Sequence, residues 1–180
     1  MRNEGLELFA GLLEYPTSAL PGQVEACIEC LDAEPPEAVA MLAKFQHELE
    51  HHSPAQMEEL YTRTFDMQPV CYPYVGYHLF GESYKRGAFM AKLVEGYRAL
   101  GYAVENELPD HVAVVLHFLA LGTRARDSEF GRTLLLEGLL PALEKMTAAL
   151  EGEPSSPYGA VLSALRLVLD DSTEKETVDA

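Results

Sequence analysis

Apolar residues recur every three or four positions along most of this chain, and prolines interrupt that pattern at intervals. Leu6, Phe9 and Leu13 follow this spacing, which places them on one face of a helix, and Pro16 ends the segment. Pro21 stands where the next helix can begin, because a proline is tolerated in the first turn of a helix but not inside one. No stretch alternates apolar and polar residues over the length of a strand. The pattern therefore predicts an all-α fold.

The proline and glycine positions divide the chain into about seven to nine predicted helices. A chain of 180 residues can bury most of its unfolded surface in one core, and no linker or internal repeat divides it. We therefore expect a single helical-bundle domain at residues 1–170 and a flexible acidic tail at 171–180, with the last helix ending at Leu169. Residues 130–150 are predicted to be helical, with Pro141 as a kink or an interhelical break.

The chain is strongly acidic, with 13 Lys and Arg residues against 29 Asp and Glu residues and a net charge of −16 at pH 7. Such a field repels a phosphate backbone, so we expect no nucleic acid as a partner and favour cationic partners. No apolar run reaches the roughly 18–20 residues that span a bilayer, and the first residues lack a signal-peptide pattern. Three cysteines do not suit a secreted disulfide framework. These features predict a soluble cytoplasmic protein without direct membrane insertion.

Two groups of residues could bind a metal. Cys27 and Cys30 form a C-x-x-C motif, but a structural zinc site needs four ligands and only Cys71 remains, so we expect the pair to face the core. His47 and His51 lie four residues apart near the end of a predicted helix, with no third ligand at a defined spacing. We therefore expect no metal site and no cofactor. A small metal-dependent or ligand-binding enzyme would have to use these residues.

Residues 66–82 break the helical pattern, because four aromatic residues and a histidine lie there among prolines and glycines. We expect a loop or a short irregular helix. Its rings either pack in the core or line an apolar groove for a peptide, and the residues alone favour neither. No phosphate-binding loop, dinucleotide-binding motif or nucleophile elbow is present, so no motif indicates an enzyme. The candidates for a peptide groove in this segment are Tyr74, Tyr77, His78 and Phe80.

Three motifs, in order, resemble those of the NarJ-type nitrate reductase molybdenum cofactor assembly chaperones, the delta subunit family within the TorD/DmsD redox-enzyme maturation chaperones. The motifs are Y-x-x-T-F-D at 61–66, H-x-x-G-[ED]-S-x-x-R-G-x-x-M at 78–90 and E-L-P-D-[HY] at 107–111. The dense similarity covers about residues 60–120. Beyond the groove candidates, the residues that match the motifs are Tyr61, Phe65, Asp66, Gly81, Glu82, Ser83, Arg86, Gly87, Met90, Leu108, Pro109, Asp110 and His111.

The resemblance implies a TorD-like all-α fold and a non-catalytic cytoplasmic chaperone. Its partner would be the N-terminal segment of the apo catalytic subunit of a molybdopterin oxidoreductase, either a nitrate reductase or another membrane-anchored or exported molybdoenzyme. The chaperone would support molybdenum cofactor insertion before membrane docking or export, with molybdenum cofactor biosynthesis proteins as further candidate partners. The acidic helical chain is compatible with a basic or amphipathic peptide. A structural subunit that stays in the mature complex is an alternative of another class.

The resemblance also gives the motif residues expected roles. Gly81 and Gly87 are expected to permit turns or close helix approach, and Met90 is expected in the core. Glu82, Arg86 and Asp110 are expected to form a buried or half-buried polar network, which is either structural or faces the peptide. The residues that we predict to bind the peptide are Tyr74, Tyr77, His78, Phe80, Glu82, Arg86, Asp110 and His111.

Overall fold

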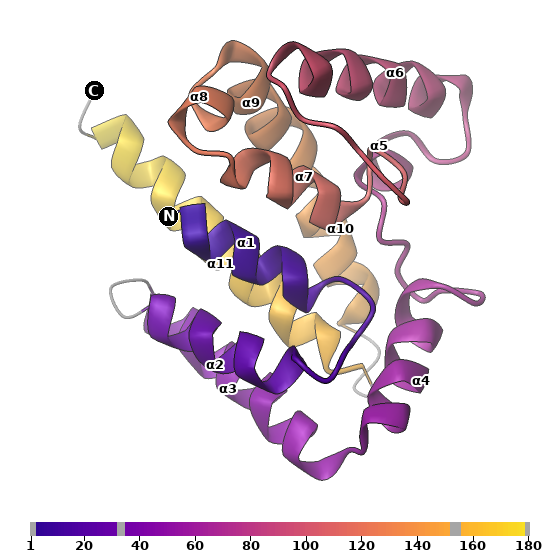
Figure 1. Cartoon of the computed structure of the whole chain (residues 1–180), viewed down its shortest axis with the longest axis vertical. Helices are drawn as coiled ribbons and strands as arrows, with labels where there is room; N and C mark the ends of the chain where they lie inside the picture. The colour runs from indigo at the N-terminus through magenta and orange to yellow at the C-terminus, as the bar shows by residue number, and fades with distance from the viewer. Residues whose placement is uncertain (1–2, 32–34, 152–155, 179–180) are drawn as a thin grey trace.

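The computed structural model describes residues 3–31, 35–151 and 156–178, and this part of the chain is helical without a β-strand (Figure 1). The all-α prediction is therefore confirmed. Within these described residues, eight helices are nine residues or longer, which is within the predicted range: α1 (Asn3–Leu12), α2 (Leu20–Cys30), α3 (Pro36–His51), α4 (Pro54–Phe65), α6 (Tyr84–Ala99), α7 (Val112–Ala120), α10 (Leu140–Leu150) and α11 (Tyr158–Val178). The shorter segments are α5 (Val75–Phe80), α8 (Thr123–Arg126), α9 (Glu129–Thr133) and a π-helical stretch at Leu134–Leu139. None of the described helices is long and apolar enough to cross a membrane.

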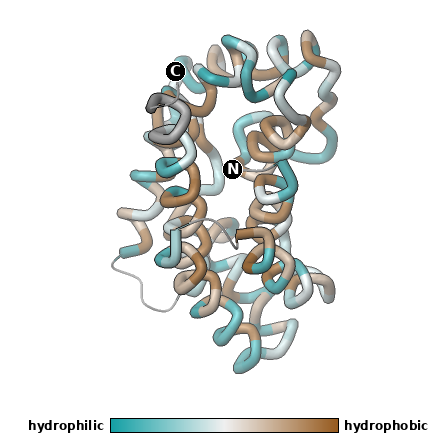
Figure 2. Tube along the Cα trace, turned by 90° about the vertical axis from the view of Figure 1, so that its left-hand side faces the viewer, coloured by the Kyte–Doolittle hydropathy of each residue, from teal (hydrophilic) through white to brown (hydrophobic). Residues whose placement is uncertain are grey.

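The helices pack around one hydrophobic core. α1 packs on α2 and α7, while α11 packs on α3 and α10, so the first part of the C-terminal helix is enclosed by the bundle and its last turns project from it (Figure 1). Apolar and polar stretches follow one another with each turn of the helices, as Figure 2 shows, so the apolar residues of a helix share the face that packs on the core. Phe45, Tyr61, Phe65 and Tyr158 meet in this core, where neighbouring ring centroids lie 5.1–5.6 Å apart.

The last helix is longer than the sequence analysis predicted. α11 continues to Val178, whereas we expected it to end at Leu169 and residues 171–180 to form a tail. No proline or glycine follows Leu169, and local contacts support the extra turns. Arg166 and Asp170 are ion-paired at 3.8 Å, and the Ser172 hydroxyl donates to the Val168 carbonyl at 2.7 Å. The boundary at Leu169 was therefore wrong, and residues 170–178 are helical.

Pro141 coincides with the predicted irregularity. It lies in the first turn of α10, directly after the π-helical stretch at Leu134–Leu139. Proline lacks an N–H, so it cannot donate to the carbonyl four residues before it. The chain widens here instead, and the N–H of Leu140 bonds the carbonyl of Leu135, five residues back. The result is a bulge within a continuous helical path.

The irregular segment before α6 lies beside the start of α7. Tyr74 and His111 form an isolated antiparallel bridge. Val75 N–H donates to the Asp110 carbonyl at 2.7 Å, and Val112 N–H donates to the Pro73 carbonyl at 2.8 Å. This pairing brings the residues just before the second motif beside the third motif, which lies 35 to 39 residues later in the sequence.

Candidate functional site

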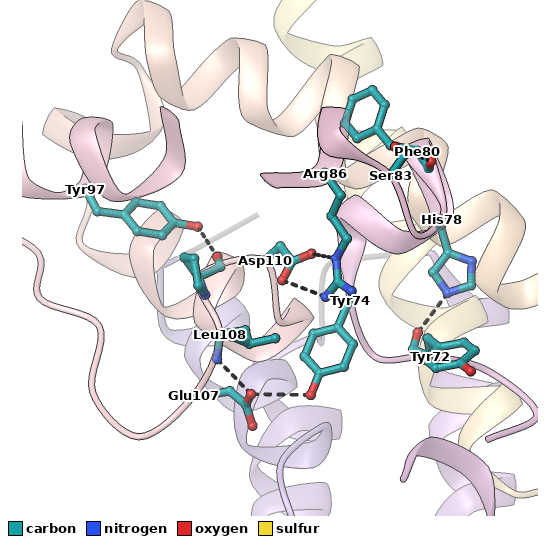
Figure 3. A network of polar contacts seen from close by, with 11 residues as sticks. Tyr72, Tyr74, His78, Phe80, Ser83, Arg86, Tyr97, Glu107, Leu108 and Asp110 are labelled. Carbon is teal, nitrogen blue, oxygen red and sulfur yellow. Dashed lines mark hydrogen bonds and ion pairs between the residues drawn. The ribbon is translucent and has the colours of Figure 1, made fainter. Parts of the chain in front are cut away.

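A buried ion pair joins α6 to the turn that precedes α7 (Figure 3). Asp110 is fully buried, and Arg86 donates from Nε to its Oδ2 at 2.8 Å and from Nη2 to its Oδ1 at 3.3 Å. These hydrogen bonds raise the pKa of Arg86 above its ordinary value. Gly76 of α5 approaches the same carboxylate, because a Cβ at this position would lie 2.7 Å from Asp110 Oδ2. The pair therefore holds α5, α6 and the start of α7 together.

Tyr74 extends this network toward the surface. Its ring lies under the Arg86 guanidinium, 4.9 Å from the centroid, and its hydroxyl donates to Glu107 Oε1 at 3.5 Å. Burial and the charge of Glu107 raise the pKa of Tyr74. His111 packs edge-on against Tyr74 and is 5% exposed, and its Nδ1 accepts from the Ala113 N–H at 3.2 Å. Burial lowers the pKa of His111, so this ring is neutral at pH 7.

His78 is half-buried, and its side chain contacts other parts of the protein. Its Nε2 donates to the Tyr72 carbonyl at 2.7 Å, and the Cys71 sulfur lies 3.8 Å from the same nitrogen. Burial lowers the pKa of His78, so it stays neutral at pH 7. Lys145 of α10 donates to the His78 carbonyl at 2.8 Å. These contacts give His78 a structural role in fastening α5 to α10.

The predicted peptide-binding residues are divided among several hollows beside this network. Phe80 lines a groove of about 700 Å³ between α6 and the α9–π-helical segment, which we call the apolar groove. Tyr74 and His111 line a hollow of about 620 Å³ on the other side of the ion pair, which we call the acidic hollow. Glu82 and Arg86 line an open hollow of about 780 Å³ beside the first turns of α6. The structure therefore does not bring the candidates into one continuous groove.

Tyr77 and Asp110 lie outside the lining of these three hollows. Tyr77 stacks on Tyr72 with 3.8 Å between ring centroids, and both rings are half-buried. Figure 3 shows that the Phe80 ring points away from Tyr74 and His78. Phe80 is therefore the one aromatic residue of the segment 66–82 that lines the apolar groove, next to Leu79.

The apolar groove has aromatic walls and an acidic rim. Phe80 is 38% exposed and contacts Phe89, with 5.5 Å between the ring centroids, and Phe130 forms the facing wall. Gly96 lies directly under the Phe130 ring, where any Cβ would overlap it, so the absence of a side chain lets α6 and α9 approach. The charged residues that line the groove are Lys92, Glu95, Glu129 and Glu137. Three carboxylates against one ammonium group favour an occupant that is apolar and basic.

The acidic hollow is polar by contrast. The carboxylates that line it are Glu14, Asp66, Glu105 and Glu107. His117 of α7 pairs with Glu7 at 2.9 Å and with Glu14 at 3.1 Å, and the hydrogen bonds to these groups raise its pKa to about 9. His117 is therefore a cation at pH 7 that ties α1 to α7 at the edge of this hollow.

Of the two cysteines in the C-x-x-C motif, Cys27 faces the core as we expected. Cys27 is fully buried in the core, and burial raises the pKa of its thiol to about 12, so it is a poor nucleophile and metal ligand. Cys30 is half-buried one turn later on α2. Cys71 is also buried and lies in the distant segment before α5, and none of the three forms a disulfide within the described part of the chain. These cysteines do not converge on one site.

The comparisons with known proteins identify the family. A family model described as nitrate reductase delta subunit matches residues 28–171, which is most of the chain. The chain belongs to the nitrate reductase delta subunit family. The nitrate reductase molybdenum cofactor assembly chaperone NarJ of Escherichia coli (strain K12) is 27% identical over 177 residues, covering 96% of this chain and 72% of that protein.

Two further comparisons agree with this membership. The nitrate reductase-like protein NarX of Mycobacterium tuberculosis (strain ATCC 25618 / H37Rv) is 30% identical over 155 residues, which are 86% of this chain but 22% of NarX. A crystal structure described as a candidate redox enzyme maturation protein from Archaeoglobus fulgidus superposes with a TM-score of 0.67, at 24% identity, and the match covers 94% of both chains. That structural similarity supports the predicted TorD-like fold.

Several delta subunit motif residues serve the fold. Tyr61 and Phe65 are in the core, and the Tyr61 hydroxyl donates to the Leu13 carbonyl at 3.2 Å. The Pro109 carbonyl accepts from the Tyr97 hydroxyl at 3.0 Å, which fixes the turn before Asp110. Asp66, at the end of α4, and Leu108 are exposed. Gly81 has φ +61°, so it supports the turn that we expected of it.

The structure contradicts the expected roles of two motif residues on α6, Gly87 and Met90, and shows what Ser83 does. Ser83 is at the N-cap position, but its hydroxyl donates to the Phe80 carbonyl at 2.9 Å and does not cap the helix. A Cβ on Gly87 would have no atom within 4 Å, so this glycine is not needed for a close helix contact. Met90 is half-buried beside the open hollow and is not part of the core. Gly87 is therefore exposed and Met90 half-buried, whereas the resemblance implied a turn or close helix approach for Gly87 and a core position for Met90.

The far wall of the apolar groove, formed by Phe130 and Leu134, was not predicted from the sequence. Phe130 and Leu134 lie outside the motifs, in a segment that showed only helical periodicity. Helical spacing identifies the side of a helix that is buried, but not the element that packs against it. The two glutamates around His117 were missed for the same reason, since Glu7 and Glu14 lie about a hundred residues away in the sequence.

Proposed function

We propose that this protein is a chaperone for the apo catalytic subunit of a nitrate reductase-like molybdopterin oxidoreductase. It binds the subunit in the cytoplasm and supports molybdenum cofactor insertion before membrane docking or export. The observation that carries this proposal is the delta subunit family match over residues 28–171, with relatives that are named as molybdenum cofactor assembly chaperones. The role is non-catalytic, because the chaperone changes the yield of assembly and catalyses no step.

The N-terminal segment of the catalytic subunit is the part that we propose to bind. A segment that forms an amphipathic helix can bury its apolar side in a groove and leave its polar side in water. The apolar groove suits this mode, because Phe80, Phe89 and Phe130 supply large rings with few rotatable bonds. Its three glutamates and the charge of −16 favour a segment with basic residues.

The other predicted residues support the groove in this proposal. The Arg86–Asp110 pair positions the first turn of α6, which begins at Tyr84, four residues after Phe80. Glu82, exposed between α5 and α6, can contact a basic side chain beyond the end of the groove. The acidic hollow, with Tyr74 and His111, lies on the opposite side of the ion pair and is open to a different part of the same client.

A pull-down from cytoplasm tests the function. The protein is expected to capture the catalytic subunit of a molybdopterin oxidoreductase in its cofactor-free form, measured by mass spectrometry and by molybdenum content. Capture of the fully assembled, cofactor-loaded complex would instead indicate a subunit that stays in the mature enzyme. Failure to capture any such subunit contradicts the proposal.

Peptide titration tests the groove separately. Truncating a buried aromatic anchor costs about 2 kcal/mol or more, so Phe80→Ala should weaken binding of the client's N-terminal peptide at least about tenfold. Leu136→Ala is the matched control, because Leu136 is a 50% exposed apolar residue of the neighbouring π-helical stretch outside the groove lining. Tyr77→Ala tests whether the stacked rings of Tyr72 and Tyr77 also bind the peptide. Equal affinity of Phe80→Ala and wild type would move the peptide site away from the apolar groove.

A further inference from the structure

The last turn of α3 brings three potential metal ligands together. His47, Glu50 and His51 each offer one ligand atom, and these atoms all lie within 4.8 Å of one another. The two imidazole rings lie 4.3 Å apart between centroids, and His47 Nδ1 is 3.8 Å from Glu50 Oε2. All three side chains are exposed, so small rotations about their own bonds can close these separations to those of a metal coordination shell.

The hydrogen bonding of His51 resembles that of a metal ligand. Its Nδ1 donates to the His47 carbonyl at 2.7 Å, which puts the ring proton on Nδ1 and leaves Nε2 with a free lone pair. Metal-binding histidines usually donate their second ring nitrogen to a carbonyl or carboxylate in this way, which fixes the orientation of the ring. The helix backbone therefore already orients one of the two imidazoles.

The chemistry of the three ligands selects the kind of metal. Imidazole nitrogens suit zinc, nickel and copper, whereas calcium and magnesium prefer sites made of oxygen. The negative end of the α3 dipole and the neighbouring Glu48 add to the attraction for a cation, and Lys44 is the one lysine or arginine of this helix. We propose that His47, Glu50 and His51 bind one late first-row transition-metal dication, with Zn²⁺ as the reference ion.

The proposed site is open on one side. Three protein ligands leave at least one coordination position for water or another donor. His47 also lines a hollow of about 950 Å³ with mixed polar and apolar walls between α3, α4 and the start of α11, so there is space beside the site for such a ligand. The site lies on α3, apart from α5 and α6, and is independent of the proposed peptide groove.

Zinc titration of the full chain without an affinity tag tests the site. Calorimetry should show one Zn²⁺ bound per chain and no saturable binding of Mg²⁺ at the same concentrations. His51→Gln and His47→Gln should each lower the zinc affinity by about tenfold or more, and Glu50→Gln should also lower it, because each change removes one ligand. All three positions are exposed, so far-ultraviolet circular dichroism should be unchanged.

His52→Gln is the matched control. His52 follows the cluster directly and its Nδ1 makes the same type of bond, to the Glu48 carbonyl at 2.8 Å, but it is not one of the three converging residues. This variant should bind zinc as wild type does. The proposal is overturned if no binding saturates near one equivalent, or if His47→Gln and His51→Gln bind zinc as tightly as wild type. An affinity loss in His52→Gln as large as in those two variants would also overturn it.

Discussion

Replacing Arg86 with alanine should destabilise the fold strongly, because it leaves the carboxylate of Asp110 without its cation. Asp110 is fully buried, and both of its oxygens accept from Arg86. Breaking a buried ion pair by removing one partner costs about 3–5 kcal/mol. The Arg86 side chain is 17% exposed, so water can reach the vacated space, and we expect the lower value, about 3 kcal/mol. For a chain of this size that corresponds to a fall in melting temperature of about 6–12 °C.

Urea unfolding followed by circular dichroism measures this loss, with Arg98→Ala as the control. Arg98 is an exposed arginine of the same helix, so its removal should change the free energy of unfolding by no more than about 0.5 kcal/mol. If the cost comes from the buried charge, the double variant Arg86→Ala/Asp110→Asn should be more stable than Arg86→Ala alone. A single variant as stable as Arg98→Ala, or a double variant less stable than Arg86→Ala, would refute this reasoning.

Two further predictions concern pH and glycine positions. The pKa of His117 is raised from 6.5 to about 9. Its contribution to stability is therefore complete below pH 6.5 and is lost as the pH rises through about 9. Over this pH range the urea midpoint of His117→Gln should fall less than that of wild type. Gly96→Ala should destabilise the protein by about 1–3 kcal/mol, since the new methyl group overlaps Phe130, whereas Gly87→Ala should stabilise it by about 0.5–1 kcal/mol, since nothing lies within 4 Å. Equal urea midpoints for the two glycine variants would contradict this account of α6.

The sequence predicted the helices better than the contacts between them. Proline positions and apolar spacing are local signals that need no knowledge of the neighbouring helices. The start of α4 is also fixed locally, because the Ser53 hydroxyl accepts from the Gln56 N–H and Gln56 Oε1 accepts from the Ser53 N–H. The end of α11 was missed because a polar segment without apolar periodicity was expected to fray. Helical propensity and local hydrogen bonds extend it to Val178.

The sequence identified residues of the candidate site but did not show how they are arranged in space. The motifs identified Glu82, Arg86 and Asp110 as a polar network; the structure pairs Arg86 with Asp110, whereas Glu82 is exposed. The sequence could not show that Phe80 and Tyr74 face opposite sides of this pair, because that depends on the direction of each side chain in a short irregular helix. Glu50 was visible between His47 and His51, but only the structure brings its carboxylate to both rings.

The molybdenum content of the client enzyme tests the central claim most directly. The catalytic subunit should be purified from strains with and without this chaperone, and molybdenum should be measured per polypeptide by mass spectrometry. We expect the strain without the chaperone to contain the polypeptide with little molybdenum, and the intact gene to restore the metal. A full molybdenum load and normal activity in the strain that lacks the chaperone would contradict the account.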